Sequence, residues 1–291
     1  MPGPQAARLP GGRLHLQHGP IDLLIRAWGE PAEIEAAYAQ AEAAFATVLP
    51  TLVTELHELR RPVADDRPNL VGPVARRMAA AVWPHRTTFI TPMSAVAGAV
   101  ADHMLDAMLK GRRLKRAYVN DGGDIAIHLS PGTSITIGMV ADIALPSLDG
   151  TLRLSADDPV RGIATSGQGG RSFSLGIADA VTVLARDAAT ADAAATLIAN
   201  AVDLASTSIR RVPARDLDPD SDLGDRLVTV EVGPLSDTEI ETALDRGVAR
   251  AEALRAAGHI VAAALWLRGR SRLVGGSDML LPGKPDAARD D

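Results

Sequence analysis

Strand-like and helix-like segments follow one another along this chain without the regular strand–helix–strand rhythm of a doubly wound parallel sheet. Alternating or β-branched runs predict the strands, and apolar residues at helical spacing predict the helices. Because the order is irregular, the pattern favours an α+β fold of mixed or antiparallel sheets packed against helices. No repeat or linker divides the chain, so we expect a single domain over residues 13–276. Residues 1–12 and 277–291 are rich in Pro, Gly, Ala and charge, which predicts disordered tails.

Helical spacing is clear after residue 30, and one apolar stripe there comprises Ile34, Tyr38, Ala41, Phe45, Val48 and Leu52. The predicted helices cover residues 31–52, 73–82, 94–109, 188–202 and 237–256. The predicted strands cover residues 13–29 (two strands), 87–91, 134–143, 180–185, 227–232 and 259–269. Residues 162–170 are predicted as a glycine-rich turn and residues 206–226 as a polar loop.

Composition excludes several classes of protein. The 291 residues carry a net charge of −6 without a basic patch, so we expect no nucleic-acid partner. The absence of cysteine excludes disulfides, thiolate metal sites and a cysteine nucleophile. No secretory pattern and no apolar run of about 20 residues is present, so we expect a cytoplasmic protein without a membrane span.

The stretch YVNDGGDIAIHL, residues 118–129, joins two strand-like runs through two glycines. It has two interpretations. In the first, Gly122 and Gly123 form a tight hairpin turn that Asp121 caps. In the second, the bare backbone lets a ligand approach while Asp124 hydrogen-bonds to it.

Two further stretches carry residues suited to phosphate and metal. In GIATSGQGGR, residues 162–171, exposed N–H groups and Arg171 could cradle a phosphate, although the stretch lacks the Walker pattern and also fits a solvated loop. In TADAAATL, Asp192 and Thr196 lie four residues apart on one helical face, as hard oxygen ligands suited to Mg²⁺. The alternative is a first-turn acid favoured by the helix dipole and a packed threonine.

Other candidates are weaker. The small residues of MSAVAGAVAD, residues 93–102, fit close packing of a helix against a neighbour or a ligand. His103 and His128 are more typical of partly buried structural histidines than of catalytic bases. The acidic loop at residues 216–222 lacks the glycine and the terminal glutamate of an EF-hand, which favours a solvated loop. No G-x-S-x-G nucleophile elbow occurs.

Taken in order, SAVAGAVAD, VNDGGDI, GIATSG and ADAAAT resemble the motifs of the ApbE family of FAD:protein FMN transferases. The resemblance spans roughly residues 90–203. The stretches DPDSDLGD and GHIVAAALWLRG are similar to the UPF0280 proteins, a branch with an ApbE-like fold.

The resemblance implies an ApbE-like site. Mg²⁺ would be held by Asp192, Thr196 and a main-chain oxygen near Val96, and would bridge the pyrophosphate of FAD. A Thr or Ser hydroxyl of a target protein would attack, giving a phosphoester-linked FMN and AMP. The residues implied to line the flavin nucleotide pocket are Asn120, Gly122, Gly123, Asp124, Thr165, Ser166, Gly167 and Arg171.

Two departures leave catalysis open. The family's motif lysine falls on Ala97, and its His-Ile-Ile-Asp-Pro-x-Thr-Gly stretch is replaced by SFSLGIADAV, where Asp179 is the only acid and so the weak candidate for a catalytic group. The sequence therefore also fits a non-catalytic nucleotide-binding or assembly protein, or an enzyme for another phosphorylated or carboxylated small molecule. Its Ala-rich helices fit a monomer or a homodimer.

Overall fold

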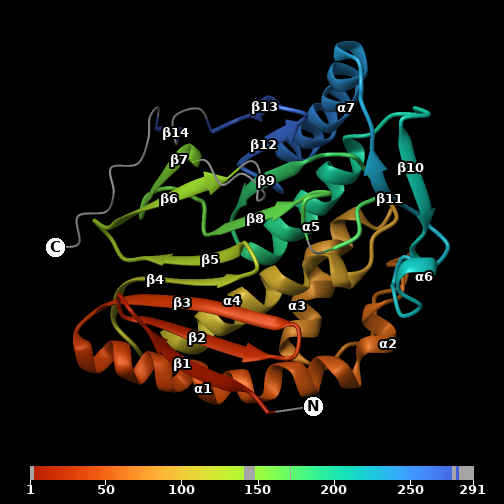
Figure 1. Ribbon diagram of the computed structural model, residues 1–291. Coiled ribbons are helices and arrows are strands. Elements are labelled where there is room, and N and C mark those ends of the chain that lie inside the picture. The colour runs from red at the N-terminus through yellow and green to blue at the C-terminus, as the bar shows by residue number, and fades with distance from the viewer. Residues whose placement is uncertain (1–2, 141–147, 171, 277–279, 282–291) are drawn as a thin grey trace. The chain divides into compact units, whose positions relative to one another are not determined.

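Helices and antiparallel strand pairs make up the computed structural model, which describes residues 3–140, 148–170, 172–276 and 280–281 (Figure 1). This confirms the predicted α+β fold. The chain forms two compact units. The first holds residues 1–133, 159–164 and 184–193, and the second holds residues 134–158, 165–183 and 194–291. The boundary falls inside three elements, β8 (Gly162–Ser166), β9 (Ala180–Ala185) and α5 (Ala188–Ala201).

The first unit is built on an antiparallel sheet with the order β1-β2-β3-β4-β5-β8. Its strands are β1 (Gln5–Leu9), β2 (Arg13–His18), β3 (Ile21–Gly29), β4 (Leu114–Asp121), β5 (Asp124–Leu129) and β8. The hairpin predicted over residues 13–29 is confirmed. Alternate residues of β2, β3 and β4 are buried, because one face of the sheet is covered by helices.

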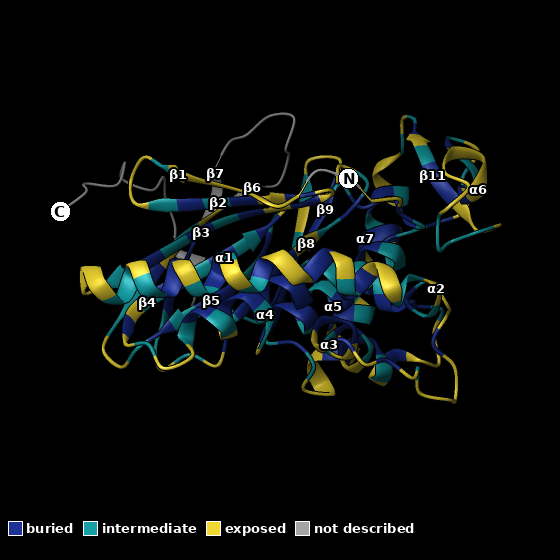
Figure 2. Ribbon diagram, turned by 90° about the horizontal axis from the view of Figure 1, so that it is seen from below, coloured by how far each residue is buried: buried dark blue, intermediate teal, exposed yellow. Residues whose placement is uncertain are grey.

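Helices α1 (Pro31–Thr54) and α4 (Val96–Leu109) pack on that face of the sheet (Figure 2). The predicted stripe of α1 is buried except at its first residue, Ile34, which keeps part of its surface. Pro50 lies inside α1 without ending it. The unit also contains α2 (Leu56–Leu59), α3 (Pro73–Val82) and two short 3₁₀ helices at Trp83–His85 and Pro92–Ala95.

The N-terminal segment differs from the disordered tail predicted over residues 1–12, because Gln5–Leu9 pair with β2 as an edge strand. Arg8 accounts for part of this order. Its guanidinium lies 4.6 Å from the centre of the Tyr38 ring and forms a 3.0 Å ion pair with Glu35. The cation–π contact and the ladder bonds hold a segment whose composition alone suggests disorder. Of the tail predicted over residues 277–291, only Leu280–Leu281 are described, and they form β14.

The second unit contains a three-stranded sheet in the order β14-β7-β6, formed by β6 (Ser134–Val140), β7 (Leu148–Ser155) and β14. Beside β9 lie β12 (Ala262–Leu267) and β13 (Arg270–Val274), against which α7 (Asp237–Ala256) packs. A separate ribbon joins β10 (Ile209–Pro213) to β11 (Leu227–Val232), with α6 (Ala214–Leu217) between them. In the described part of the chain, no helix is long and apolar enough to cross a membrane.

Three local predictions were wrong. Residues 87–91 form no strand. Ile90 is buried, as the apolar pattern suggests, but its carbonyl accepts a single long-range backbone bond, from Val63, and no ladder forms. The polar loop predicted over residues 206–226 contains β10 and α6, because its charges lie on a ribbon where Arg211 pairs with Asp203. The turn predicted at residues 162–170 begins as β8.

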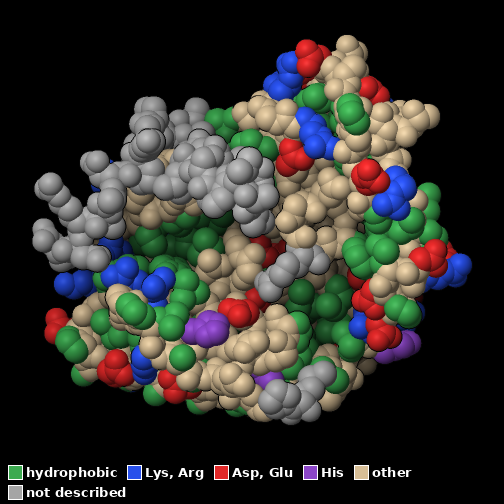
Figure 3. Space-filling view, viewed as in Figure 1, with side chains coloured by type: hydrophobic (Ala, Val, Ile, Leu, Met, Phe, Trp, Pro, Cys, Tyr) green, Lys and Arg blue, Asp and Glu red, His purple; other side chains and the backbone are tan. Residues whose placement is uncertain are grey.

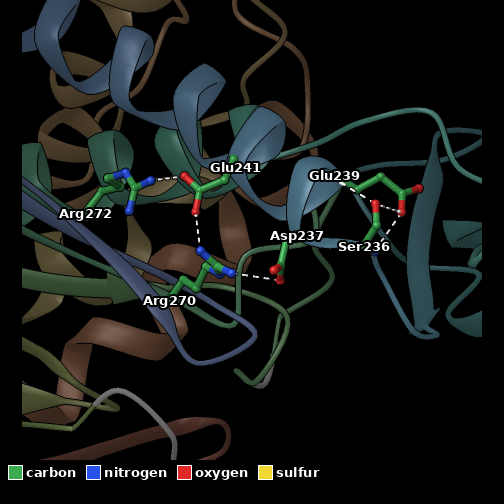
Figure 4. Close-up of polar contacts among 6 residues, drawn as sticks. All are labelled: Ser236, Asp237, Glu239, Glu241, Arg270 and Arg272. Carbon is green, nitrogen blue, oxygen red and sulfur yellow. Dashed lines mark hydrogen bonds and ion pairs between the residues drawn. The ribbon is translucent and has the colours of Figure 1, made fainter.

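The start of α7 is fixed by polar contacts (Figure 4). The Ser236 hydroxyl accepts a 3.3 Å bond from the backbone N–H of Glu239, whose carboxylate accepts a 2.8 Å bond from the backbone N–H of Ser236. Arg270 of β13 forms ion pairs with Asp237 at 2.7 Å and Glu241 at 2.8 Å. These contacts join the first turns of α7 to the neighbouring hairpin.

Replacing Ser236 by Ala is expected to lower the free energy of unfolding by about 1 kcal/mol, the usual effect of losing a hydroxyl cap. Urea denaturation measures the difference. The control is Thr238→Ala, because that side chain is exposed and the bond from the Thr242 hydroxyl goes to the backbone carbonyl of Thr238, which the change keeps. Equal destabilisation by the two changes would contradict the assigned role of the cap.

Candidate functional site

The hairpin between β4 and β5 is as tight as the sequence predicts. Asp121 and Asp124 face each other in register, and only Gly122 and Gly123 lie between them. Both glycines have positive φ, 63° and 115°, which a two-residue turn that follows the sheet twist requires. The side-chain oxygen of Asn120 accepts a 2.8 Å bond from the backbone N–H of Gly123. A Cβ on Gly123 would meet no atom within 4 Å, so its backbone borders open space.

Three carboxylates meet behind this turn. Asp121 and Asp124 are buried, at 5% and 8% exposure, and both act on Asp192 of α5. Asp124 forms a side-chain hydrogen bond with Asp192, and the charge of Asp121 opposes ionisation of Asp192. Burial is the largest cause and, with the charge of Asp121, raises the pKa of Asp192 to about 7, while the hydrogen bond with Asp124 acts in the opposite direction. The turn therefore adjoins a region with an excess of negative charge.

The carboxylate of Asp192 also caps the start of α4. It accepts a 3.1 Å bond from the backbone N–H of Gly98 and another from that of Ala97. Helix α4 has no side-chain cap of its own, so these bonds satisfy N–H groups that a helix start leaves unpaired. The alternative in which Asp192 is a first-turn acid of its own helix is wrong, because α5 begins at Ala188 and has no acid in its first turn. The helix start that Asp192 caps is that of α4.

A second aspartate makes the reverse contact. Asp102 of α4 accepts bonds of 3.1 Å and 3.0 Å from the backbone N–H groups of Ala188 and Ala189, at the start of α5. Asp102 is 6% exposed, and burial is the main cause that raises its pKa to about 6. The two helices thus cap each other reciprocally. Asp102 was missed by sequence reasoning, although it ends the motif SAVAGAVAD, because its partners lie 86 and 87 residues further along the chain.

Close contact of the backbones makes this arrangement depend on Gly98. A Cβ on Gly98 would lie 2.2 Å from the carbonyl oxygen of Ala188 and 2.5 Å from its carbonyl carbon. The predicted close packing of the small residues 93–102 is therefore found in the structure.

The residues of the GIATSG stretch belong to β8 and to the second unit after Ala164. The hydroxyls of Thr165 and Thr182 lie 2.8 Å apart, and Ser166 keeps part of its surface. Gly167 has no room for a side chain, since its Cβ would lie 2.6 Å from the carbonyl oxygen of Asp179. Arg171 lies outside the described residues.

Asp179 has a structural role. Its carboxylate accepts a bond from the backbone N–H of Arg268, and its own N–H donates a 3.0 Å bond to the carbonyl of Trp266. Arg268 and Gly269 have φ values of 51° and 76°, so Asp179 holds the tight turn between β12 and β13. This does not add to its weak candidacy as a catalytic group.

The proposed metal ligands lie on α5, four residues apart on one side of the helix. Asp192 belongs to the first unit and Thr196 to the second. Over the residues that the structure describes, no three His, Asp or Glu side chains are arranged to hold a metal ion by themselves. A cation at Asp192 would therefore also need hydroxyl, main-chain or water oxygens.

The histidines fit their structural interpretation. Burial is the largest cause that lowers the pKa of His103. Nε2 of His128 lies 3.2 Å from the carbonyl oxygen of Leu114.

A family model described as AbpE bacteria matches residues 6–273. A UPF0280 protein of Methanosarcina acetivorans is 38% identical over 137 residues, which cover 47% of this chain and 51% of that protein. A UPF0280 protein of Methanothermobacter thermautotrophicus is 40% identical over 136 residues, covering 45% of this chain and 50% of that protein. The match thus spans about half the length of these curated relatives. The resemblance to UPF0280 proteins is confirmed.

Among solved structures, the flavin transferase ApbE from Vibrio cholerae superposes with a TM-score of 0.52 at 13% identity. The superposition covers 94% of this chain and 99% of that one. At this identity the likeness concerns the fold, and it confirms the predicted ApbE-like architecture.

Proposed function

The chain belongs to the family described as AbpE bacteria, and on that premise we propose that it binds a flavin nucleotide, FAD, together with Mg²⁺. The observation that supports this most is the meeting of Asp121, Asp124 and Asp192 behind the bare Gly122-Gly123 turn. A divalent cation is the chemistry that such an excess of carboxylate charge favours, and it would lower the pKa of Asp192.

The donor set suits Mg²⁺, which takes one or two protein carboxylates and keeps several waters. Asp192 and Thr196, with a main-chain oxygen near Val96, are the proposed ligands. A bound Mg²⁺ would supply positive charge to offset a pyrophosphate. Asp192 also caps α4. The bond from the backbone N–H of Gly98 therefore fixes the Asp192 carboxylate, a proposed metal ligand, relative to the α4 backbone.

The nucleotide would approach the open side of the Gly123 backbone, next to Asn120, Gly122 and Asp124. Asn120 keeps the turn in shape through its bond to Gly123, so its role is to present the backbone to the ligand. From the order of the motifs we also assign Thr165, Ser166, Gly167 and Arg171 to nucleotide binding.

The proposed reaction is transfer of FMN from FAD to a target protein. A Thr or Ser hydroxyl oxygen of that protein bonds to the phosphorus on the FMN side, and the bond from that phosphorus to the bridging oxygen breaks. AMP leaves with the bridging oxygen, and the hydroxyl proton is lost to solvent or a base. No residue of this chain is assigned as that base.

Binding is tested by titrating the protein with FAD in the presence and absence of Mg²⁺, followed by fluorescence anisotropy. Asp192→Asn and Thr196→Val are expected to weaken Mg²⁺-dependent binding by about tenfold or more, because each removes a hard oxygen ligand. Asp192→Asn is preferable to Asp192→Ala, since the amide oxygen can still accept the bond from Gly98. The control is Asp106→Asn, on the exposed side of α4. No saturable signal from the wild type would rule out the flavin proposal.

Transfer needs its own measurement. A candidate acceptor protein should gain the mass of one FMN unit while an equal amount of AMP is released. Binding of FAD without either product, across the acceptors tested, would separate binding from catalysis.

The second candidate function is a non-catalytic binding or assembly protein. Ala97 in place of the family's motif lysine supports it, as does the structural role of Asp179. Under this function, a cellular phenotype that depends on the protein survives Asp192→Asn, whereas the transferase function predicts its loss.

A further inference from the structure

The sheet of the first unit has a second face, opposite α1 and α4, that carries aromatic rings and arginines together. We define the arginine–tryptophan face as Arg13 of β2, Arg26 and Trp28 of β3, and Arg116 and Tyr118 of β4. In the strand register, Arg13 lies opposite Arg26, Arg26 opposite Tyr118, and Trp28 opposite Arg116. All five side chains keep part of their surface, whereas the side chains that point to the other face between them are buried, at Leu14, Ile25, Ala27, Ala117 and Val119.

Trp28 is the centre of this face. The guanidinium carbons of Arg26 and Arg116 each lie 4.6 Å from the centre of its ring. The rings of Trp28 and Tyr118 lie 5.9 Å apart at 54°. Stacking holds a guanidinium in one orientation, so less side-chain freedom is lost when its N–H fork binds an anion.

The positive charges of Arg13 and Arg26 are not balanced by an acid within the described residues. Neither Arg13 nor Arg26 forms an ion pair with an acid there, since Arg13 donates to the carbonyl of Pro10 and Arg26 stacks on Trp28. The nearest acid in register on this face, Asp22, is paired with His15 at 2.9 Å. In Figure 3, Lys and Arg side chains gather at the left of the view, near the ends of β3 and β4.

The register adds a second observation. Like charges directly opposite each other on neighbouring strands destabilise a sheet, and Arg13 and Arg26 form such a pair. Both also reach Tyr118. Burial raises the pKa of the Tyr118 hydroxyl, and the positive charges of Arg26 and Arg13 oppose that rise. An uncompensated arginine pair in a chain with a net charge of −6 indicates that its counter-charge comes from another molecule.

We propose that the arginine–tryptophan face docks an extended acidic segment of a partner protein. A flat sheet face suits an extended chain, because same-face side chains repeat about every 7 Å in both. Carboxylates at alternate positions then meet the guanidinium forks, and the rings of Trp28 and Tyr118 cover the apolar stem of the segment. The docking surface does not depend on flavin or Mg²⁺ binding.

The test uses the full chain and a fluorescein-labelled peptide in which Glu alternates with Ser, followed by anisotropy at low and high salt. The wild type is expected to bind the peptide saturably, and Arg26→Ser to raise its Kd about tenfold, as the loss of a charge-assisted contact implies. Arg13→Ser should raise Kd similarly without lowering the thermal midpoint, because it removes one member of the destabilising like-charge pair. Higher salt should weaken binding in the wild type.

Two controls make the outcome decisive. Arg76→Ser changes an exposed arginine of α3 outside this face and should leave Kd unchanged. A peptide with Gln in place of Glu should not bind. Equal weakening by Arg76→Ser and Arg26→Ser, or binding of the Gln peptide with the same Kd, would overturn the proposal. Wild-type protein that binds no peptide at low salt would overturn it as well.

Discussion

Gly98→Ala is expected to lower the free energy of unfolding by about 3 kcal/mol, although alanine is the better helix former by about 1 kcal/mol. The added methyl would lie 2.2 Å from a backbone oxygen and 2.5 Å from a backbone carbon, both of Ala188. Backbone atoms at the start of α5 can move only if the helix moves, so α4 and α5 must separate. The separation also lengthens the bond from the Gly98 N–H to Asp192.

Urea denaturation at neutral pH measures this loss, and Gly3→Ala is the matched control. A Cβ on Gly3 would meet no atom within 4 Å, so the control should stay within about 0.5 kcal/mol of the wild type. If Gly98→Ala fell in the same range as the control, the close contact of α4 with α5 would not exist in solution.

Asp102→Ala is expected to cost about 3 kcal/mol, because it leaves two N–H groups at the start of α5 without their acceptor inside the protein. Asp102→Asn should cost less, since one amide oxygen remains to accept a bond. Arg77 lies 3.7 Å from the Asp102 carboxylate and also pairs with Asp106, which is exposed, so Asp106→Asn is the control.

The pH dependence of the free energy of unfolding separates the effect of the ionisable carboxyl group of Asp102 from that of its shape, which Asp102→Asn keeps. Burial raises the pKa of Asp102 to about 6, so the folded chain binds this proton more tightly than the unfolded chain does. The part of the free energy of unfolding that is linked to this proton therefore grows as pH falls through about 6 towards about 4, and is absent above about 7, where only the capping bonds of Asp102 remain. Between about pH 7 and pH 4.5 the wild type should gain about 2 kcal/mol relative to Asp102→Asn. If the wild type did not gain stability relative to Asp102→Asn as pH falls, the raised pKa of Asp102 would be contradicted.

Sequence pattern was sufficient for features that depend on near neighbours. The 118–129 hairpin, the stripe on α1 and the helices at residues 73–82, 188–201 and 237–256 are all found where residue spacing predicts them. Strand β10 was missed because its charged residues resemble a loop until Arg211 meets Asp203.

Features that join distant segments could not be predicted. Asp192 and Gly98 are 94 residues apart, and no local rule pairs them. Trp28 likewise meets Tyr118 only because β3 and β4 are neighbours, so an aromatic pair is present in a chain with only 3% aromatic residues. The assignments to nucleotide and metal stay proposals.

Reciprocal capping also constrains the order of folding. Each helix start receives its acceptor from the other helix, across 86 to 94 residues of intervening chain. Neither α4 nor α5 can satisfy these N–H groups alone, and closing so long a loop is slow. A chain with only one of the two helices in place therefore lacks both caps, so their ends should become protected from hydrogen exchange in a single kinetic step.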